Sequence, residues 1–433
     1  MSPSTALLTD HYELTMIQAA LASGHAERRC VFEAFARRLP EGRRYGVVAG
    51  TGRALEALRD FRFGEEELAF LAEREVVDRS TLDWLADFRF SGDIWGYAEG
   101  EVYFPGSPLL VVESGFAEGV VLETLFLSVL NHDSAVASAA SRMTAVAHGR
   151  PCIEMGSRRT HEASAVAAAR AAYLAGFSST SNLEAGRRHG IPTMGTAAHS
   201  YTLLHDDERQ AFANQLASLG LSTTLLVDTY DVTGAVELAV ELAGSELGGV
   251  RLDSGDLVSQ AFEVRSQLDR LGAPDTRIVV TSDLDEHAIA ALQAAPVDAY
   301  GVGTKVVTGS GHPAAGMVYK LVSRESGAGR MEGVAKASKD KASVGGRKYA
   351  LRRRSTGGEA TEEIIGINER PQDDGDDRPL LVPLVERGEV VARTDVEAAR
   401  EHHERARAEL PQRALRLSLG DPALATTYLD DWT

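Results

Sequence analysis

Seven short runs of β-forming residues alternate with helical segments in the middle of this 433-residue chain, and no other feature constrains its fold as strongly. The runs cover residues 152–156, 176–179, 192–196, 223–228, 249–253, 277–281 and 299–303. Strands that alternate with amphipathic helices at this spacing predict parallel βαβ units with right-handed crossovers. We expect an α/β fold, either a closed barrel or an open doubly wound sheet. We favour an irregular, incomplete barrel whose eighth strand is missing or irregular.

The regions on both sides of this pattern mix helical and strand periods, which predicts a separate N-terminal α/β domain. Helical spacing occurs at residues 12–23 and 65–90, and residues 101–104 and 109–113 are expected to form a hairpin. A mostly buried helix is predicted over residues 120–148. We therefore divide the chain into an N-terminal domain (1–118), a barrel that carries the active site (119–316) and a C-terminal segment (317–433) that packs back on the N-terminal domain.

Composition limits the partners and the compartment. A formal net charge of −18 argues against binding to a nucleic-acid backbone. The two cysteines, Cys30 and Cys152, lack the spacing of a disulfide framework or a metal site. Neither a basic leader followed by an apolar segment nor a run of about 18 apolar residues is present. We expect a cytoplasmic protein with no membrane partner.

Polar clusters follow nearly every predicted strand. They are Ser157 to Arg159, Ser181 and Asn182, His199 and Ser200, Asp228, Asp253 to Asp256, Ser282 and Asp283, and Gly301 to Lys305. In an α/β barrel the loops at the carboxyl ends of the strands build the active site. In a doubly wound sheet only the loops near the switch point meet. The barrel therefore predicts that these clusters converge on one cavity.

Two of these clusters suit anions and metals. Arg158 and Arg159 follow a strand, and guanidinium groups bind carboxylates and phosphates with two parallel hydrogen bonds; a surface pair is the alternative. Asp253 and Asp256 flank a Ser-Gly turn and offer hard oxygens to a divalent cation or to ribose hydroxyls. The alternative for this run is that Ser254 or Asp256 caps the next helix. Arg251 precedes it and is expected to meet a substrate carboxylate or a neighbouring aspartate.

A glycine-rich turn and one histidine complete the predicted site. Gly301 to Thr304 close the last strand, where backbone amides can approach a phosphate; a tight barrel turn is the alternative. His199 follows a run of small residues, and a partly buried structural histidine is its plainer interpretation. At the predicted edge, among arginines and aspartates, it is instead a candidate nucleophile. Anion clamps, acidic metal ligands and such a histidine suit the transfer of a phosphorylated sugar.

These motifs together resemble the nicotinate phosphoribosyltransferase family. The matching segments are 9–12 (TDHY), 156–159 (GSRR), 195–200 (GTAAHS), 226–231 (LVDTYD), 251–256 (RLDSGD) and 301–304 (GVGT). The resemblance implies the irregular α/β barrel of the type II phosphoribosyltransferases. It also implies synthesis of nicotinate mononucleotide from nicotinate and phosphoribosyl pyrophosphate, with ATP as co-substrate and Mg²⁺ as cofactor, at active sites shared in a homodimer.

The resemblance also implies roles for individual residues. His199 is the residue that ATP phosphorylates, and Tyr12 of the partner subunit stacks on the pyridine ring. Arg158 and Arg159 face nicotinate and pyrophosphate, while Asp253 and Asp256 face the ribose and the metal. The 5′-phosphate is assigned to Gly301, Val302, Gly303 and Thr304. The other residues assigned to substrate binding are Ser200, Asp228, Arg251, Ser254 and Ser282.

Three other interpretations stay open. A relative that uses nicotinamide shares the fold and mechanism, although arginines near the ring favour a carboxylate over an amide. A non-catalytic barrel that binds nucleotides is the second. A phosphosugar aldolase or isomerase is the third, and it would need a lysine or glutamate at the site, for which Lys305 is the obvious candidate. The basic stretch from Lys336 to Arg354, which includes Lys339 and Lys341, is expected to be a solvated hairpin or an aid to ATP or pyrophosphate binding.

Overall fold

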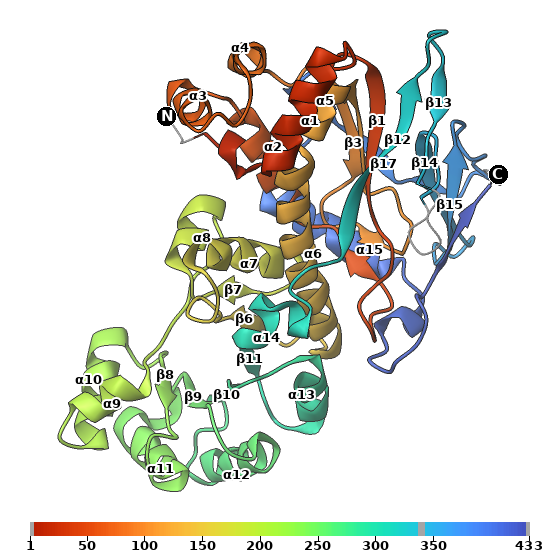
Figure 1. Ribbon diagram of the computed structural model, residues 1–433. Coiled ribbons are helices and arrows are strands. Elements are labelled where there is room, and N and C mark those ends of the chain that lie inside the picture. Colours follow the sequence, from red (N-terminus) through yellow and green to blue (C-terminus); the bar gives the residue numbers. More distant parts are fainter. Residues whose placement is uncertain (1–3, 337–342, 430–433) are drawn as a thin grey trace. The chain divides into compact units, whose positions relative to one another are not determined.

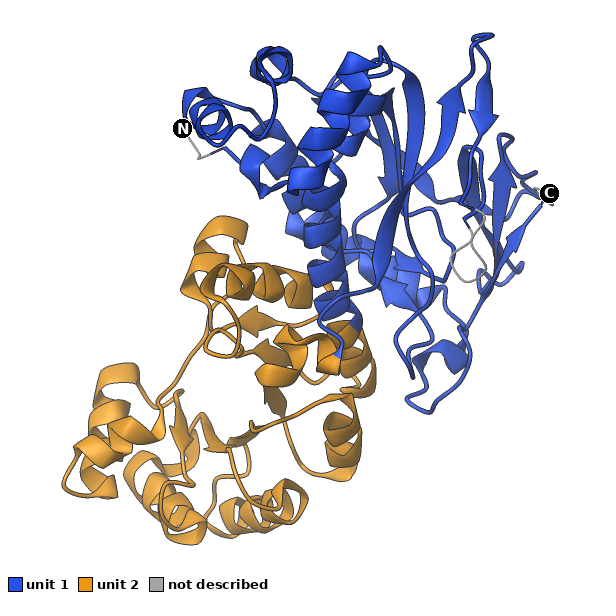
Figure 2. Cartoon of the chain, in the orientation of Figure 1, with its two compact units in different colours: residues 1–138, 312–433 blue, residues 139–311 orange. Residues whose placement is uncertain are grey.

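The structure, a computed structural model, describes residues 4–336 and 343–429. It divides into two compact units, unit 1 with Met1–Ser138 and His312–Thr433 and unit 2 with Ala139–Gly311 (Figure 2). Lys339 and Lys341 of the basic stretch lie outside the described residues. The three-part division with boundaries at 118/119 and 316/317 stays a prediction.

Unit 2 is built on a six-stranded sheet whose strand pairs are all parallel (Figure 1). In spatial order the strands are β7 (Ser179–Thr180), β6 (Cys152–Glu154), β11 (Ala299–Val302), β10 (Arg277–Val280), β9 (Gly249–Leu252) and β8 (Thr224–Leu226). Their apolar side chains, such as Val250, Ile278 and Val280, are fully buried. The alternation seen in the sequence therefore does form a parallel sheet.

The run at 192–196 is not a regular strand. It contributes an isolated parallel bridge between Thr193 and Thr180. Pro192 has no N–H to donate and Gly195 weakens a strand interior, so a longer ladder is unfavourable here. Among the described residues no ladder joins this segment to β8, so a closed barrel is not confirmed. The shown architecture is a mixed α/β fold with a parallel sheet.

Helices connect the strands of unit 2. They are α7 (Glu162–Leu174), α8 (Leu183–His189), α9 (His199–Leu204), α10 (Glu208–Leu219), α11 (Val232–Ala243), α12 (Leu257–Arg270), α13 (Glu286–Ala291) and α14 (Thr304–Val307). Aspartates at 207, 231, 256 and 285 cap four of them by accepting hydrogen bonds from backbone N–H groups of the first turn. These caps place the start of each helix directly after a loop at the sheet edge.

Unit 1 is centred on a seven-stranded antiparallel sheet. Its order is β13 (Met331–Gly333), β12 (Met317–Glu325), β1 (Arg29–Ala36), β5 (Leu110–Gly115), β3 (Asp93–Tyr97), β17 (Leu381–Glu386) and β18 (Glu389–Val390). Strands from both ends of the sequence thus share one sheet, because β12 pairs with β1 and β17 with β3. The core beneath this sheet includes Phe32 and Tyr319, whose rings stack.

The hairpin predicted at 101–104 and 109–113 is wrong. β4 (Val102–Tyr103) pairs with β2 (Gly46–Val47), whereas β5 pairs with β1 and β3. Pro105 and Pro108 flank the turn, and neither residue can donate to a hairpin ladder. Another sheet of unit 1 has the order β16 (Arg378–Pro379), β14 (Lys348–Arg354), β15 (Ala360–Ile367) and β19 (Ala425–Tyr428).

The remaining α-helices of the described residues are α1 (His11–Ala22), α2 (Thr51–Arg59), α3 (Glu65–Glu73), α4 (Arg79–Asp87), α5 (Phe116–Val120), α6 (Glu123–Val146) and α15 (Val396–Ala408). The stretch Phe116–Val146 is long and apolar enough to cross a membrane, but 61% of its most apolar window is buried inside the structure. A core helix has the same properties, so the stretch is weak evidence for a membrane segment.

A buried ionic network ties the β14–β15 sheet to the N-terminal strands of unit 1. The guanidinium group of Arg352 lies 2.9 Å from Glu363 and 3.6 Å from Glu101. Arg378 donates two hydrogen bonds to Glu101. Burial raises the pKa of Glu101, but the hydrogen bond from His402 and the charges of both arginines outweigh it and hold that pKa well below its usual range. The network therefore keeps Glu101 ionised inside the core.

Candidate active site

Three predicted residues from three different loops meet at the carboxyl ends of the parallel strands. His199 is the first residue of α9, Asp228 follows β8 and Asp253 follows β9. His199 Nε2 lies 4.0 Å from Asp228 Oδ1 and 3.8 Å from Asp253 Oδ2. On the other side of the ring, His199 Nδ1 is 3.2 Å from Thr229 Oγ1. The structure therefore brings together a nucleophile-capable ring, two carboxylates and a hydroxyl group.

Asp228 is the most buried member of this group. Its side chain is 3% exposed. Its Oδ2 accepts hydrogen bonds from Asp253 N at 3.0 Å and from Ser254 Oγ at 2.7 Å. Its Oδ1 is buried, has no hydrogen-bond partner among the described residues and faces His199. A buried carboxylate oxygen without a partner is costly, so this position suits a cation or a proton donor.

Asp253 is held from the next strand. The hydroxyl of Thr281, which follows β10, donates to Asp253 Oδ1. Its other oxygen, Oδ2, is the one that faces His199. The carboxylate is therefore oriented toward the imidazole and is still about one-third exposed, at 34%.

Arg251 holds the segment that carries the histidine. It lies on β9, and its Nη1 and Nη2 donate to Thr196 Oγ1 at 3.0 Å and to the carbonyl oxygen of Ala197 at 2.9 Å. Burial lowers the pKa of Arg251, as does the nearby positive charge of Arg158, while Asp253 and Asp228 act in the opposite direction. Both of these hydrogen bonds go to this segment, whereas the sequence suggested an aspartate or a substrate carboxylate as the partner.

Arg158 and Arg159 lie in an exposed turn after β6. Because β6 is parallel to its neighbours, this turn lies at the carboxyl edge of the sheet, and the positive charge of Arg158 lowers the pKa of Arg251. Sequence analysis missed Glu154, which ends β6 and is 1% exposed. It accepts hydrogen bonds from Thr180 Oγ1 and Gly156 N, and burial raises its pKa. Glu154 thus shapes the turn that carries the arginines.

The structure separates the roles of Asp256 and Asp253. Asp256 is exposed and caps α12, accepting from Ser259 N at 3.2 Å and from Ser259 Oγ at 2.8 Å. The hydrogen bond from the Ser259 hydroxyl lowers the pKa of Asp256. The helix-cap alternative is therefore confirmed for Asp256, whereas Ser254 binds Asp228. Ser200 is exposed in the first turn of α9.

The glycine-rich turn joins β11 to α14. A Cβ atom at Gly301 would lie 2.5 Å from Thr281 Cγ2 and 2.8 Å from Met155 Sδ, so this glycine is required for packing. Val302 is buried on the same strand, and Gly303 precedes Thr304, the first residue of α14. Close packing within β11 thus explains Gly301, while Gly303 and Thr304 are partly exposed.

Ser282 has an unusual backbone. Its φ is 122°, a region that residues with a side chain rarely adopt, and the residue is exposed after β10. Such strain costs about 1–3 kcal/mol and is found most often at functional sites. The conformation is therefore consistent with the substrate-binding role predicted for Ser282.

Tyr12 lies in unit 1, on α1. Its ring is 45% exposed and borders a cavity of about 490 Å³ that Glu123, Asn131 and Met317 also line. Burial and the charges of Glu123, Glu13 and Asp10 raise the pKa of Tyr12 to about 12. The tyrosine therefore stays neutral and presents part of an aromatic face.

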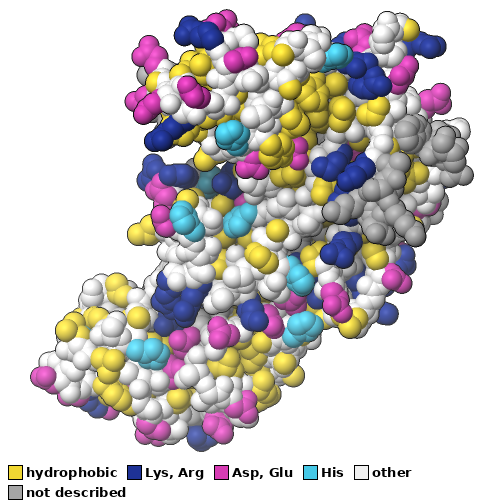
Figure 3. Space-filling model, in the orientation of Figure 1, with side chains coloured by type: hydrophobic (Ala, Val, Ile, Leu, Met, Phe, Trp, Pro, Cys, Tyr) yellow, Lys and Arg dark blue, Asp and Glu magenta, His cyan; other side chains and the backbone are white. Residues whose placement is uncertain are grey.

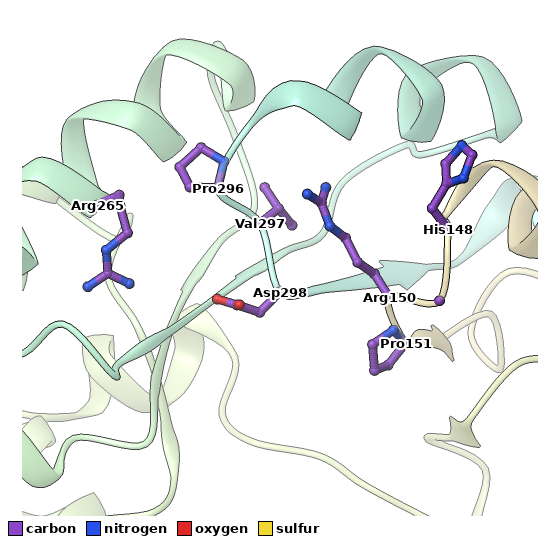
Figure 4. Close-up of a pocket in the computed structure, with 8 residues that line it drawn as sticks. His148, Arg150, Pro151, Arg265, Pro296, Val297 and Asp298 are labelled. Carbon is purple, nitrogen blue, oxygen red and sulfur yellow. The ribbon is translucent and has the colours of Figure 1, made fainter.

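Another cavity of about 490 Å³ lies where the strands of unit 2 begin, away from their carboxyl ends. His148, Arg150, Arg265 and Asp298 line it, and Figure 4 shows the two arginines on either side of Asp298. Arg150 donates to Tyr300 Oη at 2.9 Å and Arg265 to the carbonyl oxygen of Thr276 at 2.7 Å. None of the predicted site residues lines this cavity.

Among the residues that the structure describes, the one group of three or more potential metal ligands is Asp373, Asp374 and Asp377. It lies in unit 1, where Arg353 pairs with Asp377 at 3.1 Å and with Asp374 at 3.8 Å.

On unit 2, basic, acidic and histidine side chains gather on the face shown in Figure 3.

Sequence analysis also missed Thr229 and Thr281. Thr281 directly follows a strand, and Thr229 lies a few residues after one. Each contacts a predicted site residue through its hydroxyl group. Their position after a strand was the available signal, but threonine is so common that only the contact distinguishes it.

Comparisons with known proteins agree with the geometry. Residues 7–131 match the family model described as the nicotinate phosphoribosyltransferase (NAPRTase) N-terminal domain. Two nicotinate phosphoribosyltransferases of Mycobacterium tuberculosis are similar in sequence. One is 56% identical over 97% of this chain and 94% of its own length, and the other is 41% identical over 88% and 82%. The crystal structure of human nicotinic acid phosphoribosyltransferase superposes with a TM-score of 0.82 at 26% identity, covering 96% of each chain.

Proposed function

Because this chain belongs to the nicotinate phosphoribosyltransferase family, we propose that it joins nicotinate to phosphoribosyl pyrophosphate and couples this step to ATP hydrolysis through a phosphohistidine at His199. The chain is a nicotinate phosphoribosyltransferase, an enzyme of NAD biosynthesis. The products of the proposed reaction are nicotinate mononucleotide and pyrophosphate.

One observation carries the ATP-coupled part of the proposal. His199 stands between Thr229 on one side and the carboxylates of Asp228 and Asp253 on the other. Its side chain is 41% exposed, so a nucleotide can reach the ring. A phosphoryl group on the ring adds negative charge at the sheet edge where Arg158 and Arg251 lie. New ion pairs between the phosphoryl group and such arginines would link ATP hydrolysis to the binding of substrates.

The transfer reaction needs little proton chemistry. The pyridine nitrogen of nicotinate is already a nucleophile, so no general base is required. Departure of pyrophosphate leaves positive charge on the ribose carbon, which the carboxylate of Asp253 can stabilise. Arg158 and Arg159 are exposed and form the proposed clamp for the nicotinate carboxylate and for pyrophosphate.

The carboxylates also fit Mg²⁺. Asp228 Oδ1 is buried without a hydrogen-bond partner, and Asp253 Oδ2 faces the same imidazole nitrogen. Hard, ionised oxygens are the ligands that Mg²⁺ prefers. We assign Asp253 to the metal, with Asp228 beside it, and keep Asp256 as a weaker candidate because it caps α12. When bound, the metal neutralises phosphate charge.

The 5′-phosphate is assigned to the turn from Gly301 to Thr304. Gly303 and Thr304 are partly exposed at the start of α14, and Ser282 follows the neighbouring strand β10. Backbone amides and hydroxyl groups are suitable phosphate ligands. Ser200 and Ser254, both exposed near His199 and Asp228, complete the proposed substrate-binding set.

Tyr12 is proposed to act in a homodimer. Its aromatic ring is 45% exposed, although tyrosine buries favourably. A nicotinate ring bound in the partner subunit's site would stack against Tyr12 and cover its exposed surface. The oligomeric state in solution and a Tyr12→Ala variant, with KM for nicotinate as the readout, test this part.

The parallel sheet is proposed to be the irregular α/β barrel of the type II phosphoribosyltransferases. The strand order and the bridge from Thr180 to Thr193 support this, because they place the seven predicted runs in cyclic order. The enzyme is proposed to be cytoplasmic, which is supported by two buried cysteines that are both free, Cys30 and Cys152.

The decisive experiment incubates the protein with nicotinate, phosphoribosyl pyrophosphate, ATP and Mg²⁺. We expect nicotinate mononucleotide, and acid-labile phosphate on the protein. His199→Ala is expected to lose both the phosphate and the stimulation by ATP. His25→Ala is the matched control, because His25 is exposed in unit 1 and its ring contacts Ser23, which is not a proposed site residue.

Two results would contradict the proposal. If the His199 variant kept full stimulation by ATP, the phosphohistidine would be wrong. If nicotinamide were converted as well as nicotinate, the assignment of Arg158 and Arg159 to a carboxylate would be wrong.

A further inference from the structure

The environment of His199 differs between its two nitrogens. Nδ1 lies 3.2 Å from Thr229 Oγ1, within hydrogen-bond distance. Nε2 lies 4.0 Å from Asp228 Oδ1 and 3.8 Å from Asp253 Oδ2, outside hydrogen-bond distance of either. Nδ1 is therefore close enough to Thr229 to form a hydrogen bond, whereas Nε2 forms no hydrogen bond with either carboxylate.

Thr229 is well suited to hold the ring. It directly follows Asp228, whose Oδ2 is tied to Asp253 N and Ser254 Oγ. Threonine is branched at Cβ and has few side-chain conformations, so its hydroxyl group keeps its position. Among the described residues, the hydrogen-bond partner of this hydroxyl group is His199.

A neutral imidazole carries a proton on one nitrogen and a lone pair on the other. The hydroxyl oxygen of Thr229 can accept a hydrogen bond from Nδ1–H, and in that tautomer the lone pair lies on Nε2. A phosphoryl group on Nδ1 would instead have to displace the threonine side chain. With Thr229 as the acceptor, Nε2 is therefore the nucleophilic nitrogen.

We propose that Thr229 is a positioning residue that directs phosphorylation of His199 to Nε2. This inference rests on the proposed function, since it specifies how the phosphohistidine forms. The lone pair of Nε2 forms a bond to the γ-phosphorus of the nucleoside triphosphate. The bond from that phosphorus to the bridging oxygen breaks, its electron pair leaves on the nucleoside diphosphate, and the proton stays on Nδ1 facing Thr229.

The experiment identifies the isomer of phosphohistidine on the full chain. Wild type, Thr229→Val and Thr229→Ser are incubated with radiolabelled ATP and Mg²⁺, digested under alkaline conditions and analysed with standards for the Nδ1 and Nε2 isomers. We expect the wild type and T229S to carry phosphate on Nε2. T229V removes the hydroxyl group at nearly constant shape, and we expect it to be phosphorylated about tenfold more slowly and to yield a mixture of isomers.

Thr233→Val is the matched control, because Thr233 is exposed on α11 and its hydroxyl group makes no hydrogen bond among the described residues. It is expected to behave as wild type. A general loss of folding would change the rate but would not mix the isomers, and the wild-type isomer is informative without any variant.

The inference would be overturned if wild type carried its phosphate on Nδ1, or if T229V formed the Nε2 isomer alone at the wild-type rate. Absence of acid-labile phosphate from wild type would be a different failure. It would overturn the phosphohistidine of the proposed function itself, and with it the role of Thr229.

Discussion

Asp228→Asn tests how much the buried carboxylate contributes to phosphorylation of His199. The change removes one negative charge and keeps the shape of the side chain. Asp228 Oδ2 accepts from Asp253 N at 3.0 Å and from Ser254 Oγ at 2.7 Å, and the amide oxygen of asparagine can accept both bonds. We therefore expect the free energy of unfolding to change by only about 1 kcal/mol.

The expected kinetic effect follows from the geometry. Phosphorylation of a neutral imidazole leaves a positive charge on the ring, and Asp228 Oδ1 lies 4.0 Å from Nε2. Two unit charges at that distance interact by about 4 kcal/mol at an effective dielectric constant of 20. The imidazole side chain is 41% exposed, so solvent screens part of this energy. We expect a net loss of about 1–2 kcal/mol, which is about tenfold in the rate of phosphohistidine formation.

Rapid-quench measurements with radiolabelled ATP give that rate, and denaturant unfolding gives the stability. Asp207→Asn is the matched control. Asp207 also accepts a hydrogen bond from a backbone N–H, that of Gln210 at 2.8 Å, but as the cap of α10. An unchanged or faster rate in D228N would refute the reasoning. A faster rate would mean that repulsion between Asp228 and the phosphoryl oxygens exceeds its attraction to the ring.

Three further predictions concern stability. Burial raises the pKa of Glu13 to about 7. The folded state therefore binds the carboxyl proton of Glu13 more tightly than the unfolded chain does. The stability that this group contributes falls as pH rises from about 4.5 to about 7. Glu13→Gln should therefore stabilise the protein by about 1–3 kcal/mol at pH 8 and little at pH 4, and an equal effect at both pH values in denaturant unfolding would contradict this. Ser282→Gly should relieve the backbone strain at φ 122° and raise the free energy of unfolding by about 1 kcal/mol. The same change should raise KM for phosphoribosyl pyrophosphate. An unchanged KM would show that Ser282 does not bind this substrate. Arg352→Met removes the buried cation that pairs with Glu363, while Arg378 still binds Glu101, and it should cost about 3–5 kcal/mol in the same assay, whereas a loss below about 1 kcal/mol would show that the network is not coupled.

The local elements of the site were predictable from sequence. The runs at 249–253 and 277–281 became β9 and β10 because short apolar β-forming stretches between helices have few other ways to bury their side chains. The helix cap at Asp256 was one of the alternatives that the sequence left open, and it depends only on the place of this residue before α12. Such features depend on neighbours along the chain.

Features that depend on distant partners were not predictable. The run at 192–196 has strand-like composition, but its pairing depends on what lies beside it, and it forms only the bridge at Thr193. The hairpin at 101–113 failed for the same reason, since β5 finds β1 and β3 as partners. Thr229 lies in the quoted segment 226–231 but was given no role, because a hydroxyl group becomes informative only when the structure places it 3.2 Å from His199.

The sequence by itself determined that a parallel α/β sheet forms, and that histidine, aspartate and arginine side chains follow its strands. Periodicity and the right-handed crossover depend on local sterics and on burial, which the order of residues specifies. Only the tertiary structure decided that Asp228 turns one buried oxygen toward His199 while Asp256 caps a helix. Strands far apart in the chain set those distances, and hydrogen bonds and Coulomb energies depend on distance rather than on sequence spacing.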